Sequence, residues 1–166
     1  FDRTCPFFRI CDLFVGETTC DGKKKAWEIL AEDAPMYIMD IPQLKRPADF
    51  TKWEAEIHGY IKRIEELTGN KITAEKLHDA IVLVNNKRRA LQRLNAVRKA
   101  KNVPISGRDV LLIHQIAFYD DPARFTQMVN KLCDELEERI KNDVSVYESN
   151  TKRILLTGTP LSIPNW

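Results

Sequence analysis

The chain has 166 residues, of which 43% are hydrophobic and 30% are charged, with 6 glycines and 8 prolines. These values are ordinary for a folded protein with a core of its own, and they exclude collagen-like and intrinsically disordered classes. The formal net charge of +2 gives no electrostatic reason to expect a nucleic acid or an anionic membrane surface as a partner.

The first forty residues predict one βαβ unit. The apolar run Asp12–Gly16 stops at a glycine and predicts a buried strand. A polar loop follows, and then a helix is predicted over 23–32, with Trp27 on its apolar face. A second apolar run, 36–39, predicts the next strand. A strand, a cysteine-containing loop, a helix and a strand in this order imply a parallel sheet.

The middle of the chain predicts four helices, because apolar residues recur there at steps of three and four. The expected helices are 48–67, which ends near Gly69, then one that begins after Thr73 with apolar positions from Leu77 to Val97, then 107 to about 118 and 122 to about 141. Thr73 and Ser106 are expected N-caps, and Pro122 suits a first helical turn. The apolar stripes of these helices are expected to form core or helix–helix contacts. The gap in the second stripe at Lys87, Arg88 and Arg89 predicts an exposed turn or one that faces an acidic partner.

The last segment, Arg153–Gly158, predicts the first strand of a second α/β domain, followed by a loop over 159–165. The expected fold is therefore α/β with a large helical connector. The chain would comprise the C-terminal part of a first α/β domain that binds a cluster, a helical connector, and the first strand and loop of a second α/β domain, over residues 1–47, 48–150 and 151–166. Ligands of open α/β sheets bind outside the carboxyl ends of the strands, so the loops 16–22 and 158–165 could face each other across a cleft.

The ends and the cysteine content suggest an internal piece of a longer cytoplasmic protein. The chain begins at Phe1 and ends at Trp166, just after an apolar segment. It shows no secretory signal and no apolar run near the roughly 20 residues of a membrane-spanning helix. With four cysteines in 166 residues, it is not a disulfide-dense secreted domain, and clustered cysteines in such a chain are more often metal ligands or redox groups.

Cys20 is the strongest candidate for a functional residue. It follows a strand and precedes a helix that opens with Gly22 and three lysines. A thiolate in that place gains from the helix N-terminus and from the nearby positive charge. Soft thiolates select iron–sulfur clusters, zinc or copper(I). A buried, inert cysteine behind the strand is an equally weighted alternative.

The other cysteines are weaker candidates on the residues alone. Cys5 precedes Pro6-Phe7-Phe8, which favours core packing, and no paired C-x₂-C spacing indicates zinc. Cys11 is a second-line ligand or a buried residue beside the strand. A zinc site of Cys5, Cys11 and Cys20 is a further, weaker alternative. Cys133 lies within the apolar stripe of the last helix and is expected in the core.

The charged residues around Cys20 allow two interpretations each. The lysines at 23–25 could bind a phosphate-bearing ligand such as coenzyme A or a nucleotide, or they could form a solvated helix face. Glu17 and Asp21 could act in acid–base chemistry or orient a ligand, or they could cap and solvate the helix. The three histidines, His58, His78 and His114, form no metal-ligand spacing.

The segment 5–25, above all Gly-Glu-Thr-Thr-Cys-Asp-Gly-Lys-Lys-Lys over 16–25, resembles the 2-hydroxyacyl-CoA dehydratase component D / benzoyl-CoA reductase superfamily. It looks most like the branch of double-cubane-cluster anaerobic reductases. The resemblance continues through Asn86–Leu91 and Pro104–Gly107 to Arg153–Gly158, and so spans essentially the whole chain. It implies two α/β domains per subunit, with an iron–sulfur cluster held between them by cysteines.

The resemblance also implies which residues hold the cluster. Cys20 matches the cluster cysteine of the Thr-Thr-Cys-Asp-Gly loop, and Cys5 matches the cysteine before Pro-Phe in the double-cubane branch. Thr18, Thr19 and the loop amides could donate hydrogen bonds to the cluster sulfurs. Further family cysteines would lie before Phe1 and after Trp166. Two departures are Thr159, where relatives often have a cysteine, and Cys11, which matches no family position.

The implied function is that of an oxygen-sensitive enzyme whose ATP-dependent activator delivers low-potential electrons to a [4Fe–4S] or double-cubane [8Fe–9S] cluster. The first expectation is a fragment of a double-cubane reductase that acts on a small substrate, in a dimer, and is inactive by itself. The alternative is a [4Fe–4S] dehydratase subunit, in which one-electron reduction of an acyl-CoA gives a ketyl radical that eliminates a hydroxyl group. A further alternative is a non-catalytic helical interaction module.

Overall fold

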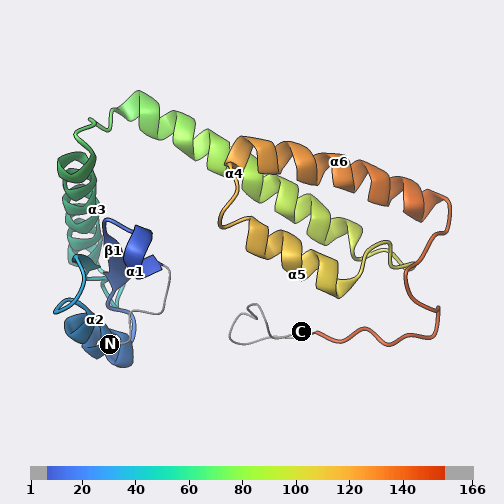
Figure 1. Ribbon diagram of the computed structural model, residues 1–166, viewed down its shortest axis with the longest axis horizontal. Helices are drawn as coiled ribbons and strands as arrows, with labels where there is room; N and C mark the ends of the chain where they lie inside the picture. The colour runs from blue at the N-terminus through green and yellow to red at the C-terminus, as the bar shows by residue number, and fades with distance from the viewer. Residues whose placement is uncertain (1–6, 156–166) are drawn as a thin grey trace. The chain divides into compact units, whose positions relative to one another are not determined.

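The computed structural model describes residues 7–155. Two compact units divide the chain at Thr73 and Ala74. In the described residues the chain forms six helices and a two-stranded parallel sheet (Figure 1). The prediction of an α/β protein that is mostly helical is thus confirmed, whereas the domain boundaries expected after residues 47 and 150 stay predictions.

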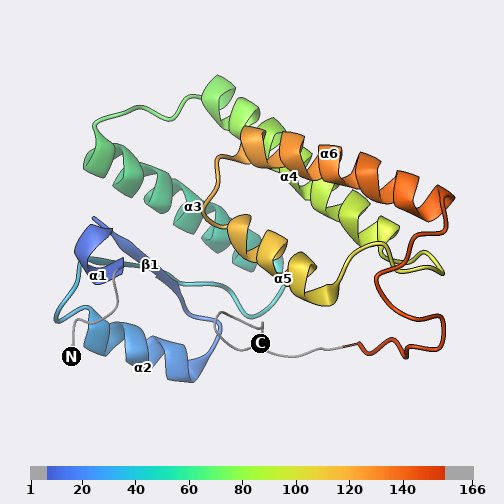
Figure 2. The same ribbon diagram turned by 45° about the vertical axis from the view of Figure 1, so that its right-hand side comes forward.

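The first unit contains the predicted βαβ arrangement. Strands β1 and β2 pair in parallel, with Phe14 opposite Met36 and Glu17 opposite Met39. Figure 2 shows α2 and α3 on opposite sides of these strands. A four-residue helix, α1, precedes β1 and was not predicted. The elements are α1 Phe7–Ile10, β1 Phe14–Glu17, α2 Asp21–Leu30, β2 Met36–Met39 and α3 Pro47–Thr68.

Helix α3 approaches the sheet closely at one point. The rings of Tyr37 in β2 and Tyr60 in α3 lie 5.7 Å apart between centroids. A Cβ built on Gly59 would come within 2.7 Å of the Tyr37 hydroxyl, so a larger residue there would have to displace the Tyr37 side chain. Away from this contact the apolar face of α3 is not core as expected, because Phe50 is 60% and Leu67 41% exposed. No described strand lies opposite those turns.

The helix end of α3 agrees with the sequence pattern. Gly69 has a φ of 70°, in the left-handed region, and its N–H donates to the carbonyl of Glu65 at 2.9 Å. This is the ordinary role of a glycine just after a helix. Pro47 occupies the first turn, where its missing N–H costs nothing.

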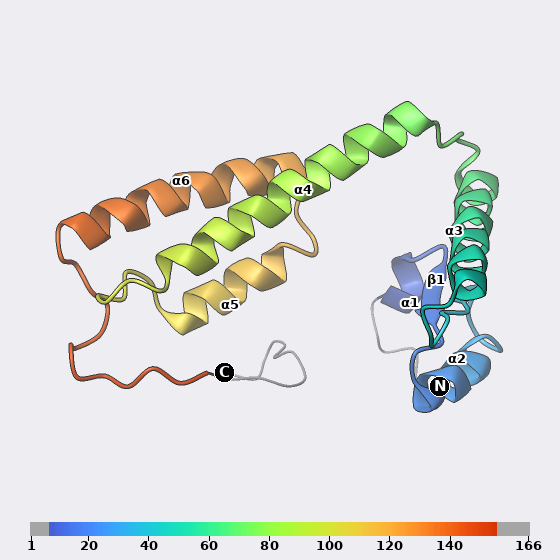
Figure 3. The same cartoon turned by 180° about the vertical axis from the view of Figure 1, so that it is seen from behind.

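The second unit is a helical bundle with a continuous core. It contains α4 Ala74–Val97, α5 Gly107–Ile116 and α6 Pro122–Lys141, and Figure 3 shows α5 and α6 beside the second half of α4. Cys133 is completely buried in this core, as predicted, and burial raises the pKa of its thiol. The core residues are Ala90, Leu94, Val97, Ile105, Val110, Ala117, Phe125, Val129, Cys133 and Leu136.

Polar contacts fix the helices of this unit to one another. Arg93 of α4 donates to Glu137 of α6 at 2.8 and 2.9 Å and to Asp134 at 2.6 Å. Lys87, within the gap of the α4 stripe, donates to the carbonyl of Ala117 at 2.7 Å, where the end of α5 favours a cation. Ser106 accepts the N–H of Asp109 at 3.1 Å, so the predicted N-cap is confirmed.

One expectation about this unit is wrong, and another is tested only in part. Leu77 and Met128, expected in the core, are 44% and 57% exposed, because the core of this unit takes in only the second half of α4 and one face of α6. The strand predicted over 153–158 is irregular chain at 153–155, and its remainder and the loop with Thr159 lie outside the described residues. A strand needs a paired neighbour for its backbone groups, and no described residue pairs with 153–155.

None of the helices described in residues 7–155 combines the length and the apolar character needed to span a membrane.

Candidate functional site

Cys20 lies at the carboxyl end of β1 and caps the N-terminus of α2. Its backbone is extended, with φ −140° and ψ 135°, and its carbonyl accepts the N–H of Lys24 at 3.1 Å. The thiol is free and exposed and makes no side-chain capping bond. A Cβ built on Gly22 would lie 3.8 Å from Sγ, an ordinary contact distance. The Cys20 side chain is therefore not buried among the described residues, contrary to the first part of the alternative, whereas its role as a ligand stays a prediction.

The loop that carries Cys20 is attached to the neighbouring strand by Thr18. The Thr18 hydroxyl donates to Oδ1 of Asp40 at 2.8 Å and accepts the N–H of Ile41 at 2.9 Å. Asp40 and Ile41 directly follow β2. The cysteine loop thus lies at the carboxyl edge of the sheet, as the βαβ order predicts.

Glu17 forms a second set of hydrogen bonds that hold the loop. Its carboxylate accepts the N–H of Thr19 at 2.8 Å and a hydrogen bond from Nζ of Lys23. These bonds, first that of Lys23 and then those of Thr19, lower the pKa of Glu17 to about 2. A carboxylate with so low a pKa is a weak proton acceptor at neutral pH, and its pairing with Lys23 and Thr19 favours the capping and solvation interpretation of Glu17.

The three lysines after Cys20 each have a carboxylate partner. Lys23 pairs with Glu17, Lys24 with Asp21 at 3.4 Å, and Lys25 with Glu28 at 2.8 Å. This is the arrangement of a solvated helix face rather than of an anion site with free cations. Asp21 is the first residue of α2 and not its cap, because Cys20 takes that position.

Two groups that were expected to donate hydrogen bonds to cluster sulfurs already donate to carboxylates of the protein. The hydroxyl proton of Thr18 goes to Asp40, and the N–H of Thr19 goes to Glu17. Sequence reasoning treated Asp40 only as the end of a strand and missed this contact. The contact could have been predicted from the polar residues that follow both strands, because the carboxyl ends of adjacent parallel strands lie at the same edge of a sheet.

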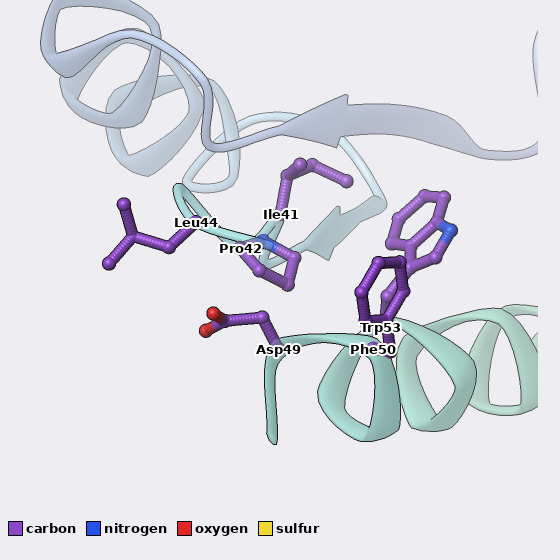
Figure 4. A pocket seen from close by; sticks show the side chains of 6 residues that line it. All are labelled: Ile41, Pro42, Leu44, Asp49, Phe50 and Trp53. Atoms are coloured by element: carbon purple, nitrogen blue, oxygen red, sulfur yellow. The ribbon is translucent and has the colours of Figure 1, made fainter. Parts of the chain in front are cut away.

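A small apolar pocket begins where β2 ends. Figure 4 shows the rings of Phe50 and Trp53, from α3, beside Ile41 and Pro42; Leu44 and Asp49 complete the lining. Its volume is about 190 Å³, which is below the several hundred Å³ of sites for larger organic ligands. The pocket can take a small apolar group, and Ile41 connects its wall to Thr18 through the hydrogen bond described above.

Of the other cysteines predicted as ligands, only Cys11 lies in the part of the chain that the structure describes. Cys5 lies outside the described residues. Cys11 follows α1 as an exposed, free thiol. Within residues 7–155, no group of three His, Cys, Asp or Glu side chains is placed to hold a metal ion. Cys20 fits a cluster by its soft, exposed sulfur, and further ligands would have to come from outside these residues.

The histidines do not join the site. His114 is half-buried on α5, and burial, with a smaller effect of Arg98, lowers the pKa of its imidazole. It belongs to the second unit. Within residues 7–155, neither His58 nor His78 belongs to a group of three or more side chains that could hold a metal ion.

Comparison with known proteins identifies relatives along the whole chain. The family model described as 2-hydroxyglutaryl-CoA dehydratase, D-component, matches residues 1–166. The chain is 36% identical over 165 residues to "Putative dehydratase subunit YjiM" of Escherichia coli (strain K12), covering 95% of this chain and 41% of that protein. It is 31% identical over 150 residues to "(R)-phenyllactyl-CoA dehydratase alpha subunit" of Clostridium sporogenes, covering 84% and 36%. The chain thus spans about two fifths of the length of these curated relatives.

Proposed function

The chain belongs to the 2-hydroxyglutaryl-CoA dehydratase D-component family, and we propose that it is part of a dehydratase subunit that uses a cysteine-held iron–sulfur cluster. The family predicted from the segment 16–25 is confirmed at this level. Membership in a family of enzymes and similarity to two dehydratase subunits favour catalysis over a non-catalytic helical module. A cytoplasmic location is part of the proposal.

The observation that carries the proposal is the exposure and the position of the Cys20 thiol. Its thiol is exposed, free of any capping bond, and held at the carboxyl edge of a parallel sheet, where α/β proteins bind ligands. Cys20 would hold the cluster together with Cys5, and the other ligands would come from parts of the protein beyond this chain. When bound, such a cluster supplies single electrons at low potential.

The proposed partners follow from the same family relation. An ATP-dependent activator protein would deliver the electrons, and a second subunit or a dimer would complete the enzyme. The substrate would be an acyl-CoA or another small molecule. The pocket beside Ile41 is large enough only for a small apolar group, so it would take at most part of such a substrate.

A double-cubane reductase is the second candidate. It is favoured by one observation, the likeness of the loop 16–25 and of Cys5-Pro-Phe to that branch of the superfamily. The names of the two relatives favour the dehydratase.

Iron and acid-labile sulfide in the intact protein, purified without oxygen, test the proposal and separate the candidates. About four irons per subunit would support the dehydratase with a [4Fe–4S] cluster, and about eight the double-cubane reductase. Zinc in place of iron would support the zinc alternative. Absence of iron with all thiols reduced would contradict both iron–sulfur candidates.

A further inference from the structure

We infer that Thr18 is a positioning residue, whose hydroxyl fastens the Cys20 loop to the end of β2 and so places the sulfur before any cluster binds. This inference rests on the proposed role of Cys20 as a ligand. It concerns a residue that touches neither the sulfur nor a substrate, and that acts through the backbone of the loop.

The first argument is the geometry of the hydroxyl. It donates to Asp40 at 2.8 Å and accepts from the N–H of Ile41 at 2.9 Å. A hydroxyl has one proton to donate, so both bonds together use its donor and one of its acceptor positions. Thr18 thereby connects the loop to Asp40 and Ile41, which lie 22 and 23 positions further along the chain. Because Thr18 lies two residues before Cys20, these two bonds fix the place at which the loop leaves the sheet.

The second argument is that Asp40, the acceptor, is itself held by α3. Its carboxylate forms an ion pair with Lys52, and its N–H donates to Oε2 of Glu56 at 3.2 Å. The hydrogen bonds of Lys52 and then of Thr18 lower the pKa of Asp40, so it accepts as a carboxylate at neutral pH. The Thr18 contact therefore connects the cysteine loop to a 22-residue helix rather than to another mobile side chain.

The third argument is that the residues on either side of Thr18 are held by other bonds, which lie within the loop or lead to α2 rather than to β2. Glu17 accepts from Thr19 and Lys23, and its carbonyl accepts Nε1 of Trp27 at 2.9 Å. Residues 17, 18 and 19 thus each make a bond that does not involve the Cys20 side chain. Metal ligands need supporting contacts of this kind to keep their geometry. Thr18 provides the part of that support that reaches the second strand.

The experiment compares three variants of the intact protein. Thr18→Val keeps the β-branched shape and removes the hydroxyl, whereas Thr18→Ser keeps the hydroxyl. Thr68→Val is the matched control, because the Thr68 hydroxyl also donates and accepts, at 2.8 Å to the carbonyl of Ile64 and at 3.3 Å from the N–H of Asn70, but both partners lie at the end of α3. Circular dichroism and thermal unfolding check that each variant is folded.

Two measurements then report on the contact. In metal-free, reduced protein, hydrogen exchange is followed in peptides that contain Ile41, whose N–H loses its acceptor in Thr18→Val. In iron-loaded protein, the release of iron to a ferrous chelator is timed. We expect exchange and iron release about fivefold faster, or more, in Thr18→Val, with Thr18→Ser and Thr68→Val near the wild type. Should Thr18→Val fail to fold, Asp40→Ala takes its place in both measurements, with Lys52→Ala beside it, because Asp40→Ala removes the ion pair with Lys52 as well as the acceptor of the Thr18 hydroxyl.

The outcomes separate this inference from the proposed function. Exchange and iron release at the wild-type rate in Thr18→Val would overturn the inference while the cluster proposal stands. Exchange and iron release as fast in Thr18→Ser as in Thr18→Val would also overturn it, since loss of the hydroxyl would not be the cause. A wild-type protein without iron would overturn the proposed function itself.

Discussion

Gly16 lies directly against the indole ring of Trp27. A Cβ built on Gly16 would come within 2.8 Å of Nε1 and 2.9 Å of two ring carbons. The same Nε1 donates to the carbonyl of Glu17 at 2.9 Å. The indole ring of Trp27 thus packs α2 against β1, directly before the loop that carries Cys20.

Replacing Gly16 by alanine should therefore destabilise the first unit. The new methyl group must displace a half-buried indole that is also hydrogen-bonded, and overpacking of this kind costs about 1–3 kcal/mol. Gly107→Ala is the control, because nothing lies within 4 Å of its Cβ position. Urea unfolding followed by circular dichroism measures both, since the tryptophans of the described residues, Trp27 and Trp53, lie in the first unit. Equal stability of the two variants would show that the ring has room to move.

The second unit should depend on the buried half of α4. Leu94 is fully buried and Leu77, on the same helix, is 44% exposed. We expect Leu94→Ala to lower the free energy of unfolding by about 2–5 kcal/mol, because it leaves a cavity between α4 and α6. Leu77→Ala should cost less than about 1 kcal/mol. Chemical denaturation compares the two, and a larger loss at Leu77 would contradict the position of the core.

The elements were predictable where the local pattern is strong. The strand 36–39 and the helix 122–141 agree with the structure at both ends, because Asp40, Pro122 and the periodic apolar residues mark their bounds. Helix α1 escaped prediction, since four residues carry no periodicity. The strand expected at 153 did not form in the described residues, because strand formation depends on a partner that the sequence of the segment itself does not reveal.

The position of Cys20 was predictable, but the contacts around it were not. Its place between a strand and a helix follows from the order of local elements. The bond from Thr18 to Asp40 joins residues 22 positions apart, and it depends on the register of β1 against β2. Likewise, the exposure of Phe50 and Met128 depends on which elements lie opposite them, although both residues belong to regular apolar stripes.

The Glu17 contacts should give the loop a defined pH dependence. Its pKa in the folded protein is about 2, below the ordinary value of 4.5. The stabilisation by this carboxylate is therefore complete above about pH 4.5 and is lost as the pH falls towards 2. Hydrogen exchange of the loop 16–22, expressed relative to the intrinsic exchange rate of the same peptides at each pH, should accelerate over that range in the wild type.

Glu17→Gln should weaken that acceleration, because the variant has no carboxylate to protonate. Glu28→Gln is the control, since Glu28 forms a similar exposed pair with Lys25 on α2 but does not contact the loop. An unchanged pH profile in Glu17→Gln would show that other groups control the loop in acid.

Cys133 should contribute to stability and not to metal binding. It is fully buried among Val129, Leu136 and the other core residues, and burial raises the pKa of its thiol. We expect Cys133→Ser to lower the free energy of unfolding by about 1–3 kcal/mol, because it buries a hydroxyl without an assigned partner. Iron content should equal that of the wild type. Loss of iron from a folded Cys133→Ser variant would contradict its assignment to the core.

The most direct test of the central claim is the iron content of Cys20→Ala in the intact protein, purified without oxygen. Cys133→Ala, which removes a thiol from the core, is measured beside it as the control. The proposed role of Cys20 predicts that Cys20→Ala loses cluster iron and its visible absorbance while Cys133→Ala keeps both. A folded Cys20→Ala variant with the full iron content of the wild type would contradict that role.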